Sequence, residues 1–437
     1  MVTRSSYDAA TSRQRHHLSL SVRTTIAALL LWGFIWVNEA WVWSRAATPV
    51  HGACSGLATL KTDPTPLMNG ISVVLKFRGL RYQVNAYGQP AWRLRPRLAG
   101  EVVQFSGQCT DLTGRFARTQ RIAHVVGRIN VSYVAEDFGE GSAAVRMANR
   151  MRRAMVRGVA RMPQTMRALF SGLVIGDDRE QPREMVQQFR SSGLSHLTAV
   201  SGQNVAYLLA VLSPLLLRLR RGSRWFVTMA ILLWFVLLTR AEPSVLRAAV
   251  MAAVVATNAA MGRRQNARVV IAITVIVLLL IDPMLAWSVG FALSVGATMG
   301  LAWFSARLAK VVGGRGVVAA TLAAQLGTAP ISLAVFGYVP VVSLLANPLA
   351  LGVAGAVMMF GLPVALVAGV LPALVVPVSW CMTIPVGYVA SVASLASTVS
   401  PHGYVNAVLW AVVPLWLWRR YRRRRDQSAS RPTAVAG

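Results

Sequence analysis

A series of long apolar segments after Ser201 restricts most of this chain to a membrane fold. The segments cover about residues 203–217, 225–239, 244–261, 268–284, 286–304, 316–336, 341–372, 378–398 and 403–418. A membrane-spanning helix needs about 20 predominantly apolar residues. Charged residues make up 14% of the chain, against about 25% in an ordinary soluble domain. The sequence therefore excludes a soluble globular enzyme.

The N-terminus reads as a basic tail followed by one further span. Arg4, Arg13, Arg15 and Arg23 precede an apolar run from Thr24 to Trp43, and the positive-inside rule keeps such a tail in the cytoplasm. A cleaved signal peptide is the alternative. The length of the run and the lack of an A-x-A cleavage site favour an anchor.

The connectors between the later apolar runs alternate between basic and nearly uncharged. Basic residues occur at 218–224, at 263–268 and at 307–315, whereas residues 240–243, 282–283 and 337–340 carry few charges. This alternation, together with the basic segment 419–425, predicts that both termini are cytoplasmic and that the number of spans is even. We expect about ten spans in a multi-pass cell-membrane protein. Residues 341–398 contain no Lys or Arg, so charge does not assign the orientation of this segment in the membrane. An extra re-entrant segment within it is an alternative.

Residues between the first span and position 140 have the composition of a small β domain. Four segments alternate like strands, at 71–78, 81–87, 101–109 and 122–131, and glycine or proline separates them. A barrel of the oligonucleotide-binding (OB) type fits this size and strand number. An extracytoplasmic β domain without a ligand is an equal alternative.

The three cysteines indicate one disulfide and no metal site. Cys54 and Cys109 both fall in the predicted outward domain, where oxidising conditions permit a bridge. Cys381 lies in an apolar segment and is expected to be a small core residue. The chain has no C-x-x-C pair, so we expect no metal and no cofactor.

A basic amphipathic helix is predicted over residues 142–170. Its arginines recur every three or four residues and so share one face: Arg146, Arg150, Arg153, Arg157 and Arg161. Such a helix lies in the membrane interface and meets lipid headgroups. A stripe that guides the phosphates of a nucleic acid is the second interpretation.

Polar residues gather immediately before and inside the first apolar helix of the second half. His196, Ser201, Gln203 and Asn204 are costly in that setting unless they face a cavity or one another, so they are candidate functional residues. A helix that begins at Ser201–Gly202 would direct free N–H groups toward an anion. The acidic pair at 177–178 is expected to be a surface turn.

Other polar residues occur inside the predicted spans. Arg247 should face a water-filled path or pair with Glu242. Gln325 and Asn347 are expected to line the path or to hydrogen-bond between helices. The net charge is +30, and between Gln187 and Arg425 the only acidic residues are Glu242 and Asp282. Passage of a nucleic acid needs basic groups and few fixed acids.

Several ordered motifs resemble those of the ComEC competence family of DNA-uptake channels. They are GLSHLTAVSG at 193–202, PSVLRAAVM at 243–251, Asp282-Pro with GFALS at 290–294, and the polar positions around Gln325, Pro330, Gly337 and Asn347. The resemblance implies that one DNA strand passes into the cytoplasm during natural transformation. It also implies an extracytoplasmic barrel domain, an extracytoplasmic DNA receptor and a cytoplasmic helicase-like ATPase as motor.

The sequence departs from the family pattern at two points. The metallo-β-lactamase-like nuclease motif H-x-H-x-D-H of many members is missing, so a separate nuclease is expected to degrade the other strand. Where the commoner pattern reads Ser-Gly-Leu-His, this chain has Ser201-Gly202-Gln203-Asn204, which puts a histidine-specific role there in doubt.

The expected fold is a polytopic α-helical membrane protein with a small extracytoplasmic OB-like β-barrel. We divide the chain into a cytoplasmic tail (1–23), an anchor (24–46), the β domain (47–140), an amphipathic and motif region (141–200), a channel domain (201–418) and a basic tail (419–437). No nucleophile elbow or Walker motif is present, so we expect a transport channel and no enzyme. Expected partners are single-stranded DNA and membrane lipids. A homo-oligomer is an alternative to a monomer. Alternatives are a permease for a small anion and a degenerate family member with an envelope role.

Overall fold

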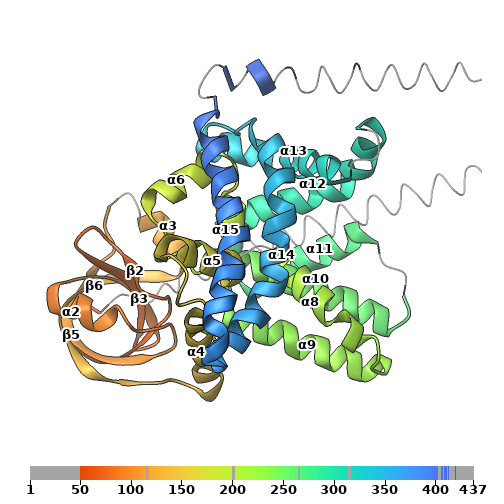
Figure 1. The fold of residues 1–437 in the computed structure, drawn as a ribbon. Helices are drawn as coiled ribbons and strands as arrows, with labels where there is room; N and C mark the ends of the chain where they lie inside the picture. Colours follow the sequence, from red (N-terminus) through yellow and green to blue (C-terminus); the bar gives the residue numbers. More distant parts are fainter. Residues whose placement is uncertain are drawn as a thin grey trace, which may run out of the picture.

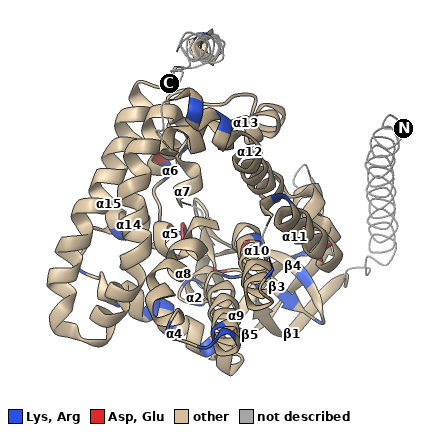
Figure 2. Ribbon diagram, turned by 90° about the vertical axis from the view of Figure 1, so that its right-hand side faces the viewer, with Lys and Arg blue, Asp and Glu red and all other residues tan. Residues whose placement is uncertain are grey.

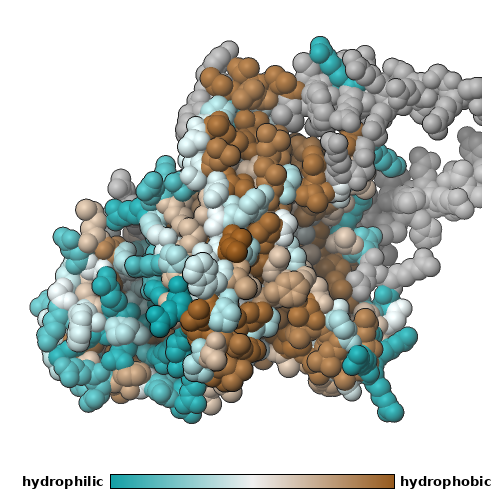
Figure 3. All heavy atoms as spheres, viewed as in Figure 1, coloured by the Kyte–Doolittle hydropathy of each residue, from teal (hydrophilic) through white to brown (hydrophobic). Residues whose placement is uncertain are grey.

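The computed structural model describes residues 50–114, 117–198, 202–263, 266–312 and 316–401, with a few positions between 405 and 419. The protein is mostly helical, and a β domain lies beside the helices (Figure 1). The predicted tail at 1–23, the anchor at 24–46, Ser201 and nearly all of 402–437 lie outside the described residues. Figure 3 shows a hydrophobic surface over the long helices and a mainly hydrophilic one over the β domain.

The β domain is a six-stranded mixed sheet in the order β1-β5-β6-β4-β3-β2, with an additional pairing between β1 and β3. Strands β4 and β6 run parallel, whereas the other paired strands are antiparallel. The strands are β1 (Gly52–Leu60), β2 (Thr65–Pro66), β3 (Gly70–Phe77), β4 (Leu80–Tyr87), β5 (Val102–Asp111) and β6 (Val125–Gly139). The short helix α2 (Gly88–Leu94) follows β4, and α3 (Ala117–Ile122) precedes β6.

Alternating apolar side chains build the core of this domain. In β3 the inward residues Ile71, Val73, Leu75 and Phe77 are all buried, as a strand with one face on a core requires. Strands β3, β4 and β5 coincide closely with three of the segments predicted from alternation, whereas β6 begins three residues after the start of the fourth segment, 122–131, and extends to Gly139. Strand β1 was missed because its sequence GACSGLATL is poor in the β-branched and aromatic residues that favour strands.

Cys54 and Cys109 form a disulfide between neighbouring strands β1 and β5. Their Cα atoms are 5.9 Å apart and both residues are buried. The third cysteine differs from expectation, because Cys381 is exposed. It lies on α15, where the exposed surface is also apolar, so hydropathy alone does not separate its inner and outer faces.

Two helices follow the sheet, where one amphipathic helix was predicted: α4 is amphipathic, whereas the last eight residues of α5 are all buried. Helix α4 (Ala143–Gly158) ends before Pro163, and α5 (Gln164–Ile175) begins directly after it. Proline lacks the N–H that an uninterrupted helix needs and restricts the residue before it, which explains why the expected helix over 142–170 is divided. Helix α6 (Arg183–Ser191) and the single turn α7 (Ser195–Thr198) then lead to the apolar helices.

Eight apolar helices coincide with the runs predicted between 203 and 398. They are α8 (Gly202–Leu216), α9 (Arg221–Leu238), α10 (Pro243–Ala260), α11 (Ala267–Ile281), α12 (Val289–Val311), α13 (Gly316–Phe336), α14 (Ser343–Val370) and α15 (Val375–Thr398). The 3-10 turns η1 (Pro283–Trp287) and η2 (Pro372–Leu374) precede α12 and α15. Six helices in the described part are long and apolar enough to cross a membrane, whereas α8 and α11 are shorter. The protein is thus a multi-pass membrane protein; the count of ten stays a prediction.

A buried network of five charged residues joins the β domain to the helices. Asp63, in the loop after β1, accepts from Arg152 of α4 at 2.9 Å and from Arg240 at 3.0 and 3.2 Å. Arg152 also reaches Asp177 at 3.0 Å, and Arg179 binds both oxygens of Asp177 at 2.6 Å. The expectation of a surface turn at 177–178 is wrong for Asp177, whose side chain is only 9% exposed.

Backbone and amide groups complete the hydrogen bonds of this network. Arg152 donates to the carbonyl of Leu238 at 2.9 Å, and Arg240 donates to the amide oxygen of Asn149 at 2.8 Å. The backbone N–H of Ala99 donates to Asp63 at 2.7 Å. Burial alone would raise the pKa of Asp63, but the charges of Arg152 and Arg240 lower that pKa well below its usual range. The pKa of Asp177 is also lowered, because the hydrogen bond from Arg179 and the charge of Arg152 outweigh burial.

A second polar contact ties the β domain to the end of α11. His124 Nε2 lies 3.1 Å from both carboxylate oxygens of Asp282, which also caps η1 through the backbone N–H of Met284. Asp282 therefore lies between α11 and η1, and this connection contacts the β domain. Because Arg240 and Asp282 follow α9 and α11, these ends of the two helices lie at the β domain.

Removal of the Arg152 charge should destabilise the protein more than any surface arginine change. Arg152→Gln leaves Asp63 and Asp177 short of a buried counter-charge, which typically costs about 3–5 kcal/mol. Arg150→Gln, on the same helix but with a 70% exposed side chain, is the matched control and should cost at most about 1 kcal/mol. Thermal unfolding of the purified protein in detergent measures both changes; equal shifts would contradict the role of the network.

The same network predicts how stability depends on pH. Carboxylates with a pKa lowered on folding stabilise the folded state above their unfolded value of about 3.9, and this contribution is lost as the pH falls toward the folded value. We expect the difference between wild type and Arg152→Gln to be equal at pH 7 and pH 5, and to shrink below about pH 4. A difference that shrinks between pH 7 and pH 5 would contradict the lowered pKa values of Asp63 and Asp177.

Loss of the disulfide should weaken the β domain. The bridge spans 55 residues, and closing a loop of this length stabilises a fold by about 4 kcal/mol in the chain-entropy description. Mass spectrometry of unreduced peptides should show Cys54 linked to Cys109, and Cys54→Ser should increase proteolysis within residues 50–140. Cys381→Ser is the matched control. Two free thiols in the β domain would contradict the pairing.

Candidate functional site

The predicted motif region leads from α6 to the start of α8 and packs against α14. Gly193 adopts a left-handed conformation with φ of +74°, and a Cβ atom there would lie 2.5 Å from the Cβ of Ser343. Only glycine therefore suits this position. The Ser343 hydroxyl in turn accepts a short hydrogen bond from the amide of Gln325 on α13. The fold thus brings the motif region and the predicted residue Gln325 to one place.

Arg247 on α10 lies beside the first residue of α8. A Cβ atom on Gly202 would lie 3.2 Å from Arg247 Nη2 and 3.1 Å from the Cβ of Ala248. The absence of a side chain at Gly202 lets α10 approach the helix start closely. Residues 199–201, which precede α8, lie outside the described residues, so the predicted role of Ser201 stays a prediction.

Among the described residues, the groups that bind the guanidinium of Arg247 are neutral. Its Nε donates to Ser294 at 2.6 Å, and its Nη1 contacts Thr298 at 2.6 Å and the sulfur of Met251 at 3.2 Å. The ion pairs of the described residues include none of Arg247. The expected alternative of a pair with Glu242 is therefore wrong, because the arginine reaches across to α12 and not back along its own helix. Arg247 is only 8% exposed.

The charge of Arg247 suits this place to an anion. The hydrogen bonds of its Nε and Nη1 go to two hydroxyls and a sulfur atom, which do not neutralise that charge. We call Gly202, Arg247, Ser294 and Thr298 the anion site.

The other predicted residues of the motif have different surroundings. Asn204 is buried, and its amide donates to the carbonyls of Leu173 at 2.9 Å and Val174 at 3.3 Å in the last turn of α5. It therefore fastens α5 to α8. Gln203 and His196 are exposed, His196 on the turn α7 (Figure 2). In the described part, no group of three His, Cys, Asp or Glu residues is arranged to hold a metal ion.

Gln325 and Asn347 leave buried acceptors without a protein partner. The amide oxygens of both side chains are buried and make no hydrogen bond. Asn347 lies one helical turn after Ser343 on α14, so it shares a face with the partner of Gln325. Buried acceptors are normally paired with protein or water. At Gln325 the hydrogen bond to Ser343 supports a bond between helices, and the unpaired oxygen supports a place on the path. Asn347 stays a predicted path residue.

The residues of the predicted basic face are exposed, four of them on α4 and Arg161 in the turn that follows it. Arg146, Arg150, Arg153, Arg157 and Arg161 are all exposed. Some of their charge is balanced locally, because Arg146 and Arg150 approach Glu140 at 3.7 and 4.0 Å and Arg153 pairs with the buried Glu101 of the β domain. This face lies next to the β domain and is separate from the anion site. Its role as guiding face stays a prediction.

Sequence patterns missed Arg152 and the two hydroxyl partners of Arg247. Arg152 falls between Arg150 and Arg153 in a basic helix, and only its spacing to the buried positions Ala148 and Met155 marks it as inward-facing. Ser294 and Thr298 are spaced by four residues, so the helix period places them on one face. Nothing in their local sequence connects them with Arg247.

Comparison with known proteins gives one family and one curated relative. A family model described as "Competence protein" matches residues 173–421, which is more than half of the chain. The protein "ComE operon protein 3" of Bacillus subtilis (strain 168) is 31% identical over 191 residues, which is 43% of this chain and 25% of that protein. The matched part thus spans about a quarter of that relative's length. No solved structure matches. The matched region contains α8 to α15 and the anion site, and the chain belongs to the competence protein family.

Proposed function

We propose that this protein forms an inner-membrane path through which a single DNA strand enters the cytoplasm during natural transformation. The observation that carries the proposal is the anion site, where a buried arginine keeps its charge at the start of a helix in the matched region. A DNA strand presents one phosphate per nucleotide, so a site that binds any phosphate serves every sequence. His196, Gln203, Gln325 and Asn347 belong to the proposed path.

The β domain supports this proposal through its strand connections and its surface. The pairing of β1 with β3 connects the first strand of the order with the fifth, beyond which only the two-residue strand β2 lies. The parallel β4–β6 pair and a helix between β4 and β5 complete the arrangement. We propose that the sheet is a closed OB-type barrel. Such barrels bind single strands through aromatic side chains and basic groups.

Arginine and aromatic side chains alternate on one surface of the β domain. The Arg97 guanidinium lies 3.6 Å from the centroid of the Phe138 ring, and Arg93 lies 5.3 Å from that of Tyr133. The neighbouring Trp92 is 74% exposed. Arg93 also pairs with Glu136 at 2.8 Å, so its role here is to hold the ring of Tyr133. Unpaired bases stack on such rings, and Arg97 is the adjacent group for their phosphates. We propose that this surface receives the strand before it reaches the helices.

The remaining parts of the proposal concern topology and partners. The β domain is proposed to lie outside the membrane, where an extracytoplasmic receptor would deliver DNA, and both termini are proposed to be cytoplasmic. A helicase-like ATPase would pull the strand, and a separate nuclease would degrade its complement. Lipids are proposed to contact the exposed arginines of α4. The proposal is the same for a monomer and for a homo-oligomer.

A small-anion permease is the second candidate, because the anion site would also bind a single phosphate or carboxylate. The exposed arginine–aromatic surface of the β domain favours DNA, since a small solute has no need for stacking rings. A family member with an envelope role and no DNA uptake is the third candidate.

The decisive experiment compares DNA uptake in a transformable host that carries wild type, a deletion or Arg247→Gln. Labelled double-stranded DNA is supplied, and label in the nuclease-protected cytoplasmic pool is measured. Loss of a charged hydrogen-bonding group weakens binding at least about tenfold, so Arg247→Gln should reduce uptake by a similar factor. Glutamine can still bond Ser294 and Thr298, and removal of the charge should not destabilise the fold.

Two control variants make the result specific. Arg263→Gln removes an exposed charge beyond the end of α10 and should leave uptake within about twofold, since an exposed rim charge contributes little. Arg247→Lys keeps the charge and should retain part of the uptake. Normal uptake by Arg247→Gln at normal protein levels would assign Arg247 to packing; normal uptake by the deletion would favour the permease or envelope candidates.

The proposed topology is tested separately. A reporter fused after Arg425 should be active only in the cytoplasm, and a second reporter inserted at the exposed turn Arg78–Gly79 of the β domain should be active only outside. If both reporters were active on the same side of the membrane, the proposed combination of an external β domain and an even number of spans between the termini would be refuted.

A further inference from the structure

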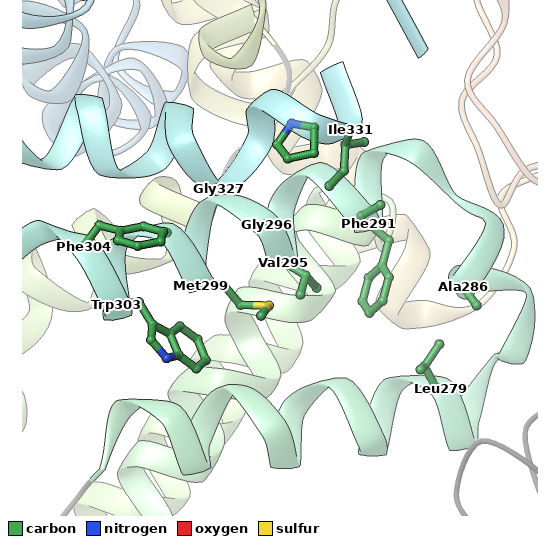
Figure 4. A pocket seen from close by; sticks show the side chains of 13 residues that line it. Leu279, Ala286, Phe291, Val295, Gly296, Met299, Trp303, Phe304, Gly327 and Ile331 are labelled. Carbon is green, nitrogen blue, oxygen red and sulfur yellow. The ribbon is translucent and has the colours of Figure 1, made fainter. Parts of the chain in front are cut away.

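An apolar groove lies between α11, η1, α12 and α13. It has a volume of about 610 Å³, and almost all of its lining is apolar (Figure 4). The larger side chains around it are Leu279, Phe291, Val295, Met299, Trp303 and Ile331. A groove of this kind binds a hydrocarbon and no polar solute, because a buried polar group without a partner costs free energy.

Close contact between two helices forms the floor of the groove. A Cβ atom on Gly327 would lie 2.0 Å from the carbonyl oxygen of Gly296, and one on Gly300 would lie 2.1 Å from that of Ala323. Helices α12 and α13 therefore touch backbone to backbone along this line. Because no side chains rise from these glycines, the contact leaves a channel between the flanking rows of larger residues.

The groove is elongated along α12. Its lining extends from Phe291 to Phe304, which corresponds to about 20 Å of helix. One leaflet of the hydrocarbon core is about 15 Å thick. The groove thus has the length of one acyl chain.

Two arginines lie at one end of the groove, without an acidic partner among the ion pairs of the described residues. The Arg268 guanidinium is 5.3 Å from the centroid of the Trp303 ring, and Arg307 follows Trp303 by one helical turn. The opposite end, near Ala286, leads to Asp282 and its contact with His124 of the β domain. A ligand with an apolar chain and an anionic head group therefore fits the groove in one orientation, with its head group at the end near Arg268 and Arg307.

Within the described part of the chain, no carboxylate is paired with these two arginines. The sequence has no Asp or Glu between Pro283 and Arg425, and the ion pairs of the described residues include neither Arg268 nor Arg307. Lipid phosphates are the anions present at the end of a membrane helix.

We propose that this groove binds one anionic phospholipid, with an acyl chain along α12 and the phosphate between Arg268 and Arg307. The bound lipid would fill the space beside the α12–α13 pair, whose Ser294 and Thr298 hold Arg247. The proposal concerns lipid binding and does not depend on the transport of DNA.

Native mass spectrometry of the full-length protein, released from detergent, tests the proposal. Phosphatidylglycerol and phosphatidylcholine are titrated separately, and the fraction of protein with one bound lipid is measured. We expect tight binding of one phosphatidylglycerol. Each contact between a basic residue and an anionic lipid contributes about a fivefold change in affinity, so Arg268→Gln with Arg307→Gln should weaken phosphatidylglycerol about 25-fold. Phosphatidylcholine should bind weakly to both proteins, and Arg263→Gln is the matched control.

A second pair of variants tests the apolar part of the site. Met299→Trp fills the groove, whereas Leu301→Trp adds the same ring to a position of α12 with similar exposure outside it. Only Met299→Trp should weaken phosphatidylglycerol, by tenfold or more. Unchanged binding in Met299→Trp, or equal binding of glycerol phosphate without acyl chains, would overturn the proposal. A dimer mass that the groove variants abolish would assign the groove to a second copy of the chain and overturn it as well.

Discussion

Burial of five charged residues at one junction constrains how the two parts of this protein fit together. Asp63 comes from the β domain, Arg152 from α4, and Arg240 from the connector after α9. A buried charge without its partner is strongly unfavourable, so these segments must meet in one arrangement. The His124–Asp282 contact adds a second attachment. Together the two contacts hold the β domain at one set of ends of α9, α10 and α11.

This junction also accounts for the distribution of charge along the helices. Asp63, Asp177 and Asp282 all lie at the β-domain ends. In the described helices α8 to α15, the charged side chains are cations: Arg247 among the helices, and Arg and Lys residues toward the ends far from the β domain. Figure 2 shows how the basic and acidic residues are distributed over the ribbon. The paired charges at the junction and the basic far ends are consistent with the proposed direction of DNA passage.

Local sequence patterns predicted the elements better than their contacts. Hydropathy located α8 to α15 within a few residues, and alternation located β3 to β6, because both signals depend on neighbours along the chain. Proline at 163 divided the expected long helix. Asp177 looked like part of a surface turn because its partner Arg152 lies 25 residues away, and Arg240 lies 177 residues from Asp63. Pairings of this separation leave no periodic trace in one sequence.

The partners of Arg247 explain why this arginine suits transport better than a buried ion pair would. A carboxylate such as Glu242 would neutralise the guanidinium and compete with any passing phosphate. Ser294 and Thr298 instead bind its Nε and Nη1 at 2.6 Å and leave its charge in place. In the proposed path, a transported chain must bind favourably enough to enter and weakly enough to leave. One charge held by hydroxyls provides an attraction of this intermediate strength.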